Sequence, residues 1–182
     1  MNRDSSWLTT AAIAVVLLAC AACGPKKLEL PPPAAAAKYP DFVFPAVVPG
    51  LGTPAAQERH HAGWLWLQAG DLRAAQRNFE AALKLAENFY PAETGLGYVG
   101  LAKKADNEAV NHFDRAIVAN PRYAPALVGR GEALLALGER EMALKSFEAA
   151  VVADELGHLC MVREAKRGIR GVVGRVKPGA RV

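Results

Sequence analysis

Residues 63–82 read GWLWLQAGDLRAAQRNFEAA, residues 97–116 read GYVGLAKKADNEAVNHFDRA, and residues 131–150 read GEALLALGEREMALKSFEAA. The three stretches begin 34 residues apart and share one residue type at each of five aligned positions. Self-similarity at a fixed period of this length predicts one supersecondary unit that is stacked three times. The shared residues are Gly63, Gly97 and Gly131; Leu67, Leu101 and Leu135; Ala75, Ala109 and Ala143; Phe79, Phe113 and Phe147; and Ala82, Ala116 and Ala150.

The repeat resembles the tetratricopeptide repeat (TPR), a helix–turn–helix unit with a Leu-Gly pair, an Ala-x-x-x-Phe spacing and a closing proline. The second copy carries these features as Leu96-Gly97, Ala109 with Phe113, and Pro121. The resemblance implies an all-α fold of three TPR helix–turn–helix repeats in a right-handed superhelix, spanning 54–157 with repeats at about 56–89, 90–123 and 124–157. The departures from the family pattern are Arg59, Glu93 and Leu127 for the first aromatic, and Glu87 and Glu155 for two closing prolines.

Small residues predict a close approach of the two helices in each repeat. Gly63 and its equivalents leave room for the partner helix, and Phe79 fills the space between the two. One pair cannot bury its apolar face alone, so neighbouring pairs share a core and the end of the stack needs a cap. Residues 158–182 are predicted to supply a capping helix and a basic tail, because apolar residues recur there at helical spacing: Leu159, Val162, Ala165 and Ile169.

The N-terminal residues resemble a bacterial lipoprotein signal peptide. Residues 8–19 carry no charge, and this stretch is shorter than the about 20 residues of a membrane-spanning helix. Cys20 follows, with Leu17 three positions before it and Ala19 directly before it. The resemblance implies that residues 1–19 are removed and that Cys20 carries the lipid. Cys23 is the alternative site, and ordinary signal-peptidase cleavage is the alternative process.

Residues 20–53 are predicted to form a proline-rich tether. Eight of the 12 prolines lie between Pro25 and Pro54, and the run at 31–33 favours polyproline II. Residues 39–49, YPDFVFPAVVP, are too apolar for a solvated linker. We name residues 39–49 the strap and expect it to lie in an extended form along the repeat domain.

Two patterns that can indicate chemistry have structural explanations here. Residues 95–100, GLGYVG, match a dinucleotide-binding fingerprint, but that site requires a preceding β-strand where the repeat predicts a helix. His60 and His61 are adjacent, so on a helix they do not face one another, and no third metal ligand is near in sequence. We expect surface or lightly packed histidines, and we predict no catalytic residue, no metal site and no cofactor.

The first helices of the repeats supply the candidate site. Trp66 is predicted to point into the core, which turns Trp64 outward, because two residues correspond to about 200° of helix. In the TPR family this side lines a concave groove that holds partner peptides. The alternative is that the strap covers this apolar surface. The resemblance implies a partner groove made of His60, Trp64, Leu67, Thr94, Tyr98, Leu101, Val128, Glu132 and Leu135.

The C-terminal residues are basic, with seven cationic residues against Glu164, a net charge of +6. An exported protein does not meet nucleic acid, so the run favours anionic lipid headgroups or an acidic partner, with simple solvation as the alternative. The cationic residues are Arg163, Lys166, Arg167, Arg170, Arg175, Lys177 and Arg181.

These observations favour a non-enzymatic, membrane-anchored scaffold for protein–protein interactions. By resemblance it acts in envelope, pilus or secretion assembly at the periplasmic face, and Ala21 after Cys20 favours the outer membrane. The alternative is a carrier of an apolar small molecule or acyl chain, which predicts a closed cavity where the scaffold predicts an open groove. An enzyme is the weakest hypothesis, and the partner and the oligomeric state stay open.

Overall fold

The computed structural model describes residues 28–32, 37–42, 47–153 and 159–173. The predicted signal peptide, both candidate lipidation sites, Cys20 and Cys23, and the basic tail after residue 173 lie outside the described residues. The described helices are α2 (Pro54–Ala69), α3 (Leu72–Leu85), α4 (Tyr90–Lys103), α5 (Asp106–Ala119), α6 (Ala124–Ala136), α7 (Arg140–Ala153) and α8 (Leu159–Val173).

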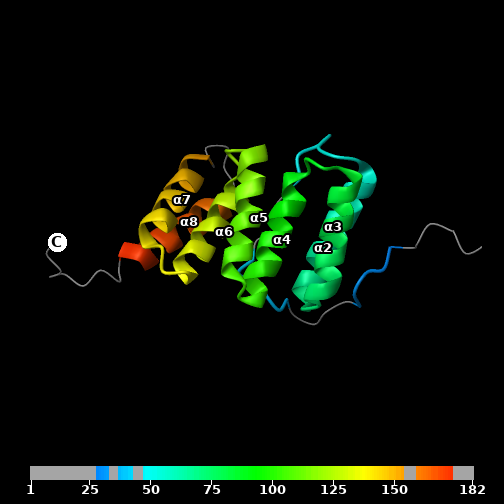
Figure 1. Cartoon of the computed structure of the whole chain (residues 1–182), viewed down its shortest axis with the longest axis horizontal. Helices are drawn as coiled ribbons and strands as arrows, with labels where there is room; N and C mark the ends of the chain where they lie inside the picture. The colour runs from blue at the N-terminus through cyan, green and yellow to red at the C-terminus, as the bar shows by residue number, and fades with distance from the viewer. Residues whose placement is uncertain (1–27, 33–36, 43–46, 154–158, 174–182) are drawn as a thin grey trace, which may run out of the picture.

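The helices form a row that runs from the pair α2–α3 through the pairs α4–α5 and α6–α7 to the capping helix α8 (Figure 1). Within each repeat the first helix packs on the second, and each second helix contacts the first helix of the next repeat. The first helices also contact one another in order, α2 with α4, α4 with α6, and α6 with α8. The all-α repeat fold with a capping helix is confirmed. In the part of the chain that the structure describes, no helix has the length and apolar character to cross a membrane.

Local sequence signals fix where the helices begin and end. A proline lies in the first turn of α2, α4 and α6, where its missing N–H costs no intrahelical bond. The side chains of Thr53 and Asp71 accept hydrogen bonds from Ala56 and Ala74, which caps α2 and α3. The turns inside the repeats contain one residue with positive φ in each copy, at Gly70, Lys104 and Gly138.

Each repeat phenylalanine lies between two glycines, one from its own repeat and one from the next first helix. A Cβ at Gly63 would lie 2.6 Å from Phe79 Cε1, and a Cβ at Gly95 would also overlap that ring. Phe79, Phe113 and Phe147 are all 1% exposed or less. The predicted close approach therefore exists both within a repeat and between neighbouring repeats.

Candidate functional site

The predicted groove residues are more deeply buried than an open groove would allow. His60, Trp64, Leu67, Thr94, Tyr98 and Val128 are at most 2% exposed, whereas Leu101, Glu132 and Leu135 are half-buried. The first helices do bring these residues to one row, because α2, α4 and α6 contact one another in order. The question is then what covers this face.

The predicted orientations of the two tryptophans were wrong. Trp64 lies in the core, with its ring edge-to-face on Phe79 at 5.9 Å between ring centroids and against Tyr98 at 5.4 Å. Trp66 is half-buried, and its indole N–H donates to the carbonyl of Glu29 at 3.1 Å. The reason is that α2 is apolar around most of its circumference, so the helix has two sides that bury tryptophan.

His60 is also a core residue, which corrects the expectation of a surface or lightly packed histidine. Its imidazole is fully buried, and Nε2 accepts a hydrogen bond from Trp64 Nε1 at 3.0 Å. The rings of Phe79 and Phe89 pack against it. Burial lowers the pKa of His60 to about 4, so the ring is neutral at pH 7. Its unprotonated Nε2 can therefore accept the hydrogen bond from the indole N–H of Trp64. His61, one residue on, is exposed.

The strap lies on the row of first helices, as predicted for its described residues. Tyr39, Phe42 and Val47 are partly buried against the core of the first two repeats. Directly before the strap, the N–H of Lys38 donates to the carbonyl of Gln68 at 2.8 Å. The strap therefore covers part of the face that sequence analysis assigned to a partner.

Gln68 in α2 holds the main chain of the strap. Its Oε1 accepts from the N–H of Tyr39 at 3.3 Å, and its Nε2 donates to the carbonyl of Tyr39 at 3.0 Å. A further contact joins Nε2 to the carbonyl of Phe42 at 3.4 Å. A side-chain amide satisfies both a donor and an acceptor of a peptide backbone in this way, so the interaction is specific for polypeptide.

The strap is not extended throughout, because residues 39–42 form a tight turn. The N–H of Phe42 donates to the carbonyl of Tyr39 at 3.1 Å, and Pro40 takes the second position, where its fixed φ favours such turns. The turn stacks Tyr39 on Phe42 with ring centroids 5.1 Å apart, and Phe42 lies 4.9 Å from the ring of Tyr98. The turn thereby places Phe42 against α4, with Tyr39 stacked on it.

The turn also places an acidic residue beside the capping helix. Asp41 Oδ1 lies 3.6 Å from Arg167 Nη1, and both side chains are more than half exposed. The described strap thus contacts α2 through Gln68, α4 through Tyr98 and α8 through Arg167. Neither the role of Gln68 nor the position of Arg167 beside the groove was predicted from the sequence. The one signal for Gln68 is an amide side chain next to Leu67 on a first helix.

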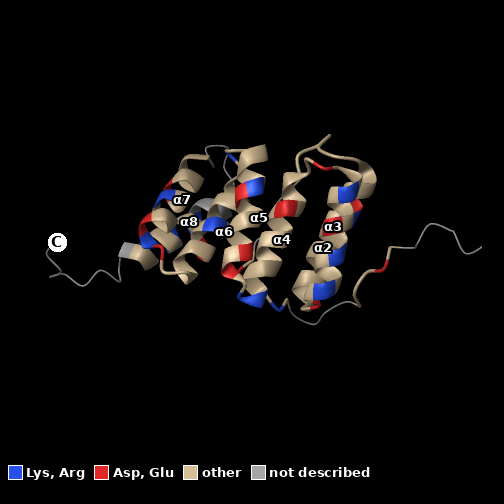
Figure 2. Cartoon of the chain, in the orientation of Figure 1, with Lys and Arg blue, Asp and Glu red and all other residues tan. Residues whose placement is uncertain are grey.

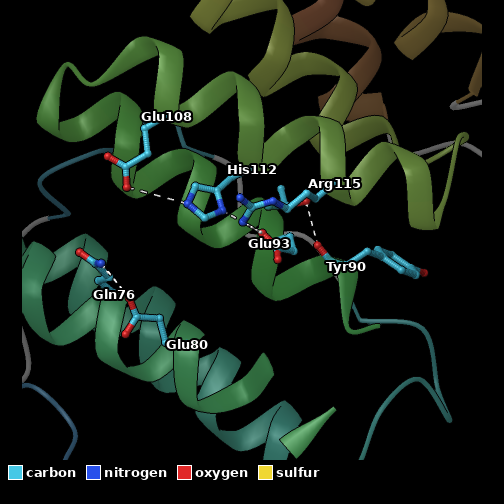
Figure 3. A network of polar contacts seen from close by, with 8 residues as sticks. Gln76, Glu80, Tyr90, Glu93, Glu108, His112 and Arg115 are labelled. Carbon is cyan, nitrogen blue, oxygen red and sulfur yellow. Dashed lines mark hydrogen bonds and ion pairs between the residues drawn. The ribbon is translucent and has the colours of Figure 1, made fainter. Parts of the chain in front are cut away.

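A second group of polar residues lies between the helices of the repeats (Figure 3). His112 Nδ1 is 2.8 Å from Glu93 Oε2, and Arg115 Nη1 is 3.8 Å from the same oxygen. In the first repeat Arg59 Nη1 donates to Asn78 Oδ1 at 3.4 Å, at the same 19-residue separation. These pairs replace the missing first aromatic of the repeat pattern, so their role is to join two helices.

The outer surface offers little specialised chemistry. Acidic and basic residues both occur along α3, α5 and α7, which is typical of a solvated face (Figure 2). An open depression beside α4 and α5 has Glu93, Arg115 and Val118 in its lining. Among the described residues, no group of three or more His, Cys, Asp or Glu side chains is arranged to hold a metal ion.

Comparison with curated proteins gives a limited match, and no family model matches the chain. Two proteins named cellulose synthase operon protein C, from Komagataeibacter xylinus and Komagataeibacter sucrofermentans, are each 33% identical over 85 residues. The match covers 44% of this chain but 6% of each relative. The chain therefore spans a small fraction of the proteins that it matches.

Solved TPR domains share the fold over most of their own length. The TPR2B domain of yeast Sti1, in complex with pHsp70, has a TM-score of 0.62 at 19% identity and covers 67% of this chain and 98% of that one. The first TPR domain of Spaghetti (RPAP3), bound to an HSP90 peptide, has a TM-score of 0.60 at 18% identity, with 70% and 97% covered. The Sgt2 TPR domain from Aspergillus fumigatus gives 0.60 at 19% identity, with 75% and 93% covered. The chain has the TPR fold, and its neighbours are protein-interaction domains.

Proposed function

We propose that this chain is a non-enzymatic protein-interaction module that binds a peptide segment of a partner on the row of first helices. The observation that carries the proposal is the pair of hydrogen bonds between the Gln68 amide and the backbone of Tyr39. This face already accommodates a polypeptide main chain. The protein and peptide partners named for the solved neighbours support the same mode of use.

The alternative, a carrier of an apolar small molecule or acyl chain, receives less support. Such a cargo offers Gln68 at most a terminal carbonyl group and no neighbouring N–H, whereas a peptide offers both groups at each residue other than proline. The candidate face is partly covered by the strap, so it is neither the open groove expected of a scaffold nor an empty closed cavity expected of a carrier. A peptide that displaces the strap can offer Gln68 the same backbone N–H and carbonyl groups that the strap offers.

We also propose that the module works at the cell envelope, held by a lipid on Cys20 at the periplasmic face, with the outer membrane favoured. The support is the sequence resemblance of residues 1–20 to a lipoprotein signal and the proline-rich tether that follows. A role in envelope, pilus or secretion assembly fits an anchored module of this kind.

Site-specific photocrosslinking in cells tests the interaction proposal. A crosslinking residue at Leu135, a half-buried groove position, should capture a partner protein, and the same residue at the exposed Val118 should not. Equal capture at the two positions would contradict the assignment of the binding face.

Metabolic labelling with a fatty acid tests the anchor independently. Cys20→Ala should abolish labelling, and Cys23→Ala should leave it intact. Labelling that persists in Cys20→Ala and disappears in Cys23→Ala would move the lipid by three residues. Labelling that survives both substitutions would contradict the lipoprotein proposal.

A further inference from the structure

We infer that the strap shows the chemistry of the ligand: the first-helix face takes a peptide whose aromatic–Pro–acidic–aromatic sequence forms a tight turn. This inference rests on the proposed function and names the class of peptide that the module binds. The strap itself, with Tyr39-Pro40-Asp41-Phe42, is the resident copy of that ligand. A partner segment of the same kind binds by replacing it.

The backbone contacts define the shape of the ligand. The side-chain Oε1 of Gln68 accepts from the N–H of Tyr39, the first residue of the turn. The side-chain Nε2 of Gln68 donates to the carbonyl of Tyr39 and also contacts the carbonyl of Phe42, the last residue of the turn. The main-chain carbonyl of Gln68 accepts from the preceding residue, Lys38. Lys38 passes so close to Gly70 that a Cβ there would lie 2.5 Å from its Cδ. The hydrogen bonds to Gln68 depend on the path of the peptide backbone, whereas the contact at Gly70 is with the side chain of Lys38.

The aromatic contacts define which side chains the ligand carries. Phe42 lies on Tyr98, and Tyr98 in turn lies edge-to-face on Phe113, so the bound ring extends an aromatic stack that begins in the core. Aromatic pairs in such geometry contribute beyond the area that they bury. Tyr39 stacks on Phe42 within the turn, so both rings belong to one bound unit. A peptide without both rings loses this part of the interaction.

The acidic position follows from the neighbouring charges. Arg167 in α8 lies beside Asp41, and Arg163, Lys166 and Arg170 are further exposed cations on the same helix. An exposed ion pair contributes little to the free energy of binding. The contact with Arg167 therefore favours peptides with an acidic residue at this position, while most of the binding free energy comes from the backbone and aromatic contacts. We expect the acidic residue to change binding by only about two- to fivefold.

The strap can leave without opening the core. Tyr39, Phe42 and Val47 are partly buried, whereas Trp64 and Phe79 are fully buried and pack on each other and on the helices of the first two repeats. The short connection to α2 keeps the strap at an effective concentration on the order of millimolar, so it competes with an incoming peptide. A partner must therefore present the same turn at better affinity or at high local concentration.

The test uses the full-length chain and a fluorescein-labelled synthetic peptide with the sequence of residues 37–48. Binding is followed by fluorescence anisotropy to wild type and to the double variant Tyr39→Ser/Phe42→Ser, whose own strap no longer competes. We expect the double variant to bind the peptide about tenfold more tightly than wild type. A control peptide with serine at both aromatic positions should bind neither chain.

Two further measurements test the contacts. In the double-variant background, Gln68→Ala should abolish peptide binding. Arg167→Glu should weaken it, and a peptide with Asp41→Lys should restore binding to the Arg167→Glu chain. Hydrogen exchange on wild type should show faster exchange at the amides of Lys38 and Tyr39 when unlabelled peptide is in excess, because both amides donate to Gln68 in the seated strap.

The inference is wrong if the double variant binds the peptide no better than wild type, or if the control peptide binds equally well. It is also wrong if the double variant unfolds by circular dichroism, because the strap is then a structural cap, or if excess peptide leaves the two amides protected. These outcomes are separate from the proposed function. A chain that captures a partner through Leu135 but ignores the strap peptide binds protein with a different sequence preference.

Discussion

Gly168 in α8 lies against the ring of Phe147 in α7, and a Cβ at that glycine would be 2.5 Å from Cζ of the phenylalanine. The same relationship joins Gly95 to Phe79 at an earlier repeat boundary. The capping helix therefore meets the last repeat as each first helix meets the repeat before it. Helix α8 thus covers the ring that the first helix of a further repeat would cover.

The substitution Gly168→Ala tests this packing. The added methyl group overlaps the Phe147 ring, and overpacking of a core site costs about 1–3 kcal/mol. Gly171→Ala in the same helix is the matched control, because a Cβ there meets no atom within 4 Å. It should stabilise the chain by up to about 1 kcal/mol through helix propensity. Urea unfolding should thus separate the two variants in opposite directions, and equal midpoints would contradict the docking of α8.

Phe113 should be the costliest single position in the middle repeat. Its ring is fully buried, and Phe113→Ala should lower the free energy of unfolding by about 3–5 kcal/mol. Val118, in the same helix, is 84% exposed, and Val118→Ala should change stability by no more than about 0.5 kcal/mol. Similar losses for the two variants in denaturant unfolding would show that the helix faces are misassigned.

His112, the neighbour of Phe113 in α5, should be less tolerant of substitution than an exposed residue, because its side chain has a partner in α4. The imidazole Nδ1 of His112 lies 2.8 Å from Oε2 of the half-buried Glu93. His112→Ala should therefore cost about 1 kcal/mol, more than an exposed substitution.

Lys104 occupies a backbone conformation that the other repeats give to glycine. Its φ is 59°, and Gly70 and Gly138, at the equivalent positions, both have φ of 85°. A residue with a Cβ is strained in this region, so Lys104→Gly should stabilise the chain by about 0.5–1 kcal/mol. Lys103→Gly is the control, and it should destabilise because residue 103 is still helical. Thermal unfolding should rank the three chains in that order, and a loss of stability in Lys104→Gly would remove the strain argument.

The fold could be predicted because its main contacts recur with the repeat. Gly63 and Phe79 face each other inside one unit, and the same pair returns 34 residues later, so one comparison of the sequence with itself identifies every helix pair. The capping helix followed from apolar spacing alone. Its contact through Gly168 did not, since that glycine falls outside the 34-residue register.

The candidate site was predicted less well, for physical reasons. Trp64 and Trp66 lie on a helix with apolar residues on most sides, so periodicity cannot decide which one enters the core. The burial of His60 was missed because Trp64, its hydrogen-bond partner one turn along the same face, was expected to point outward. The Gln68 contact depends on where a chain segment with no periodicity crosses the helices, and no repeat pattern encodes that path.

The buried pair of His60 and Trp64 makes stability depend on pH. The ordinary pKa of 6.5 falls to about 4 in the native protein, mainly because burial disfavours the charged ring; a backbone hydrogen bond at Pro91 opposes this, and His61 adds a smaller decrease. The unfolded chain therefore takes up a proton at a higher pH than the folded chain does. This contribution to stability is complete above about pH 6.5 and is lost as the pH falls towards 4, a change of about 3 kcal/mol.

The variant His60→Gln isolates this effect, since its side-chain carbonyl can still accept the indole N–H of Trp64 but does not titrate. Free energies of unfolding measured from pH 7 to pH 4.5 should fall more steeply for wild type than for His60→Gln, by about 2–3 kcal/mol over that interval. Carboxylates are common to both chains, so their titration cancels in the difference. His61→Gln, at an exposed site, should follow wild type closely. Parallel pH profiles for wild type and His60→Gln would mean that His60 is not held neutral in the core.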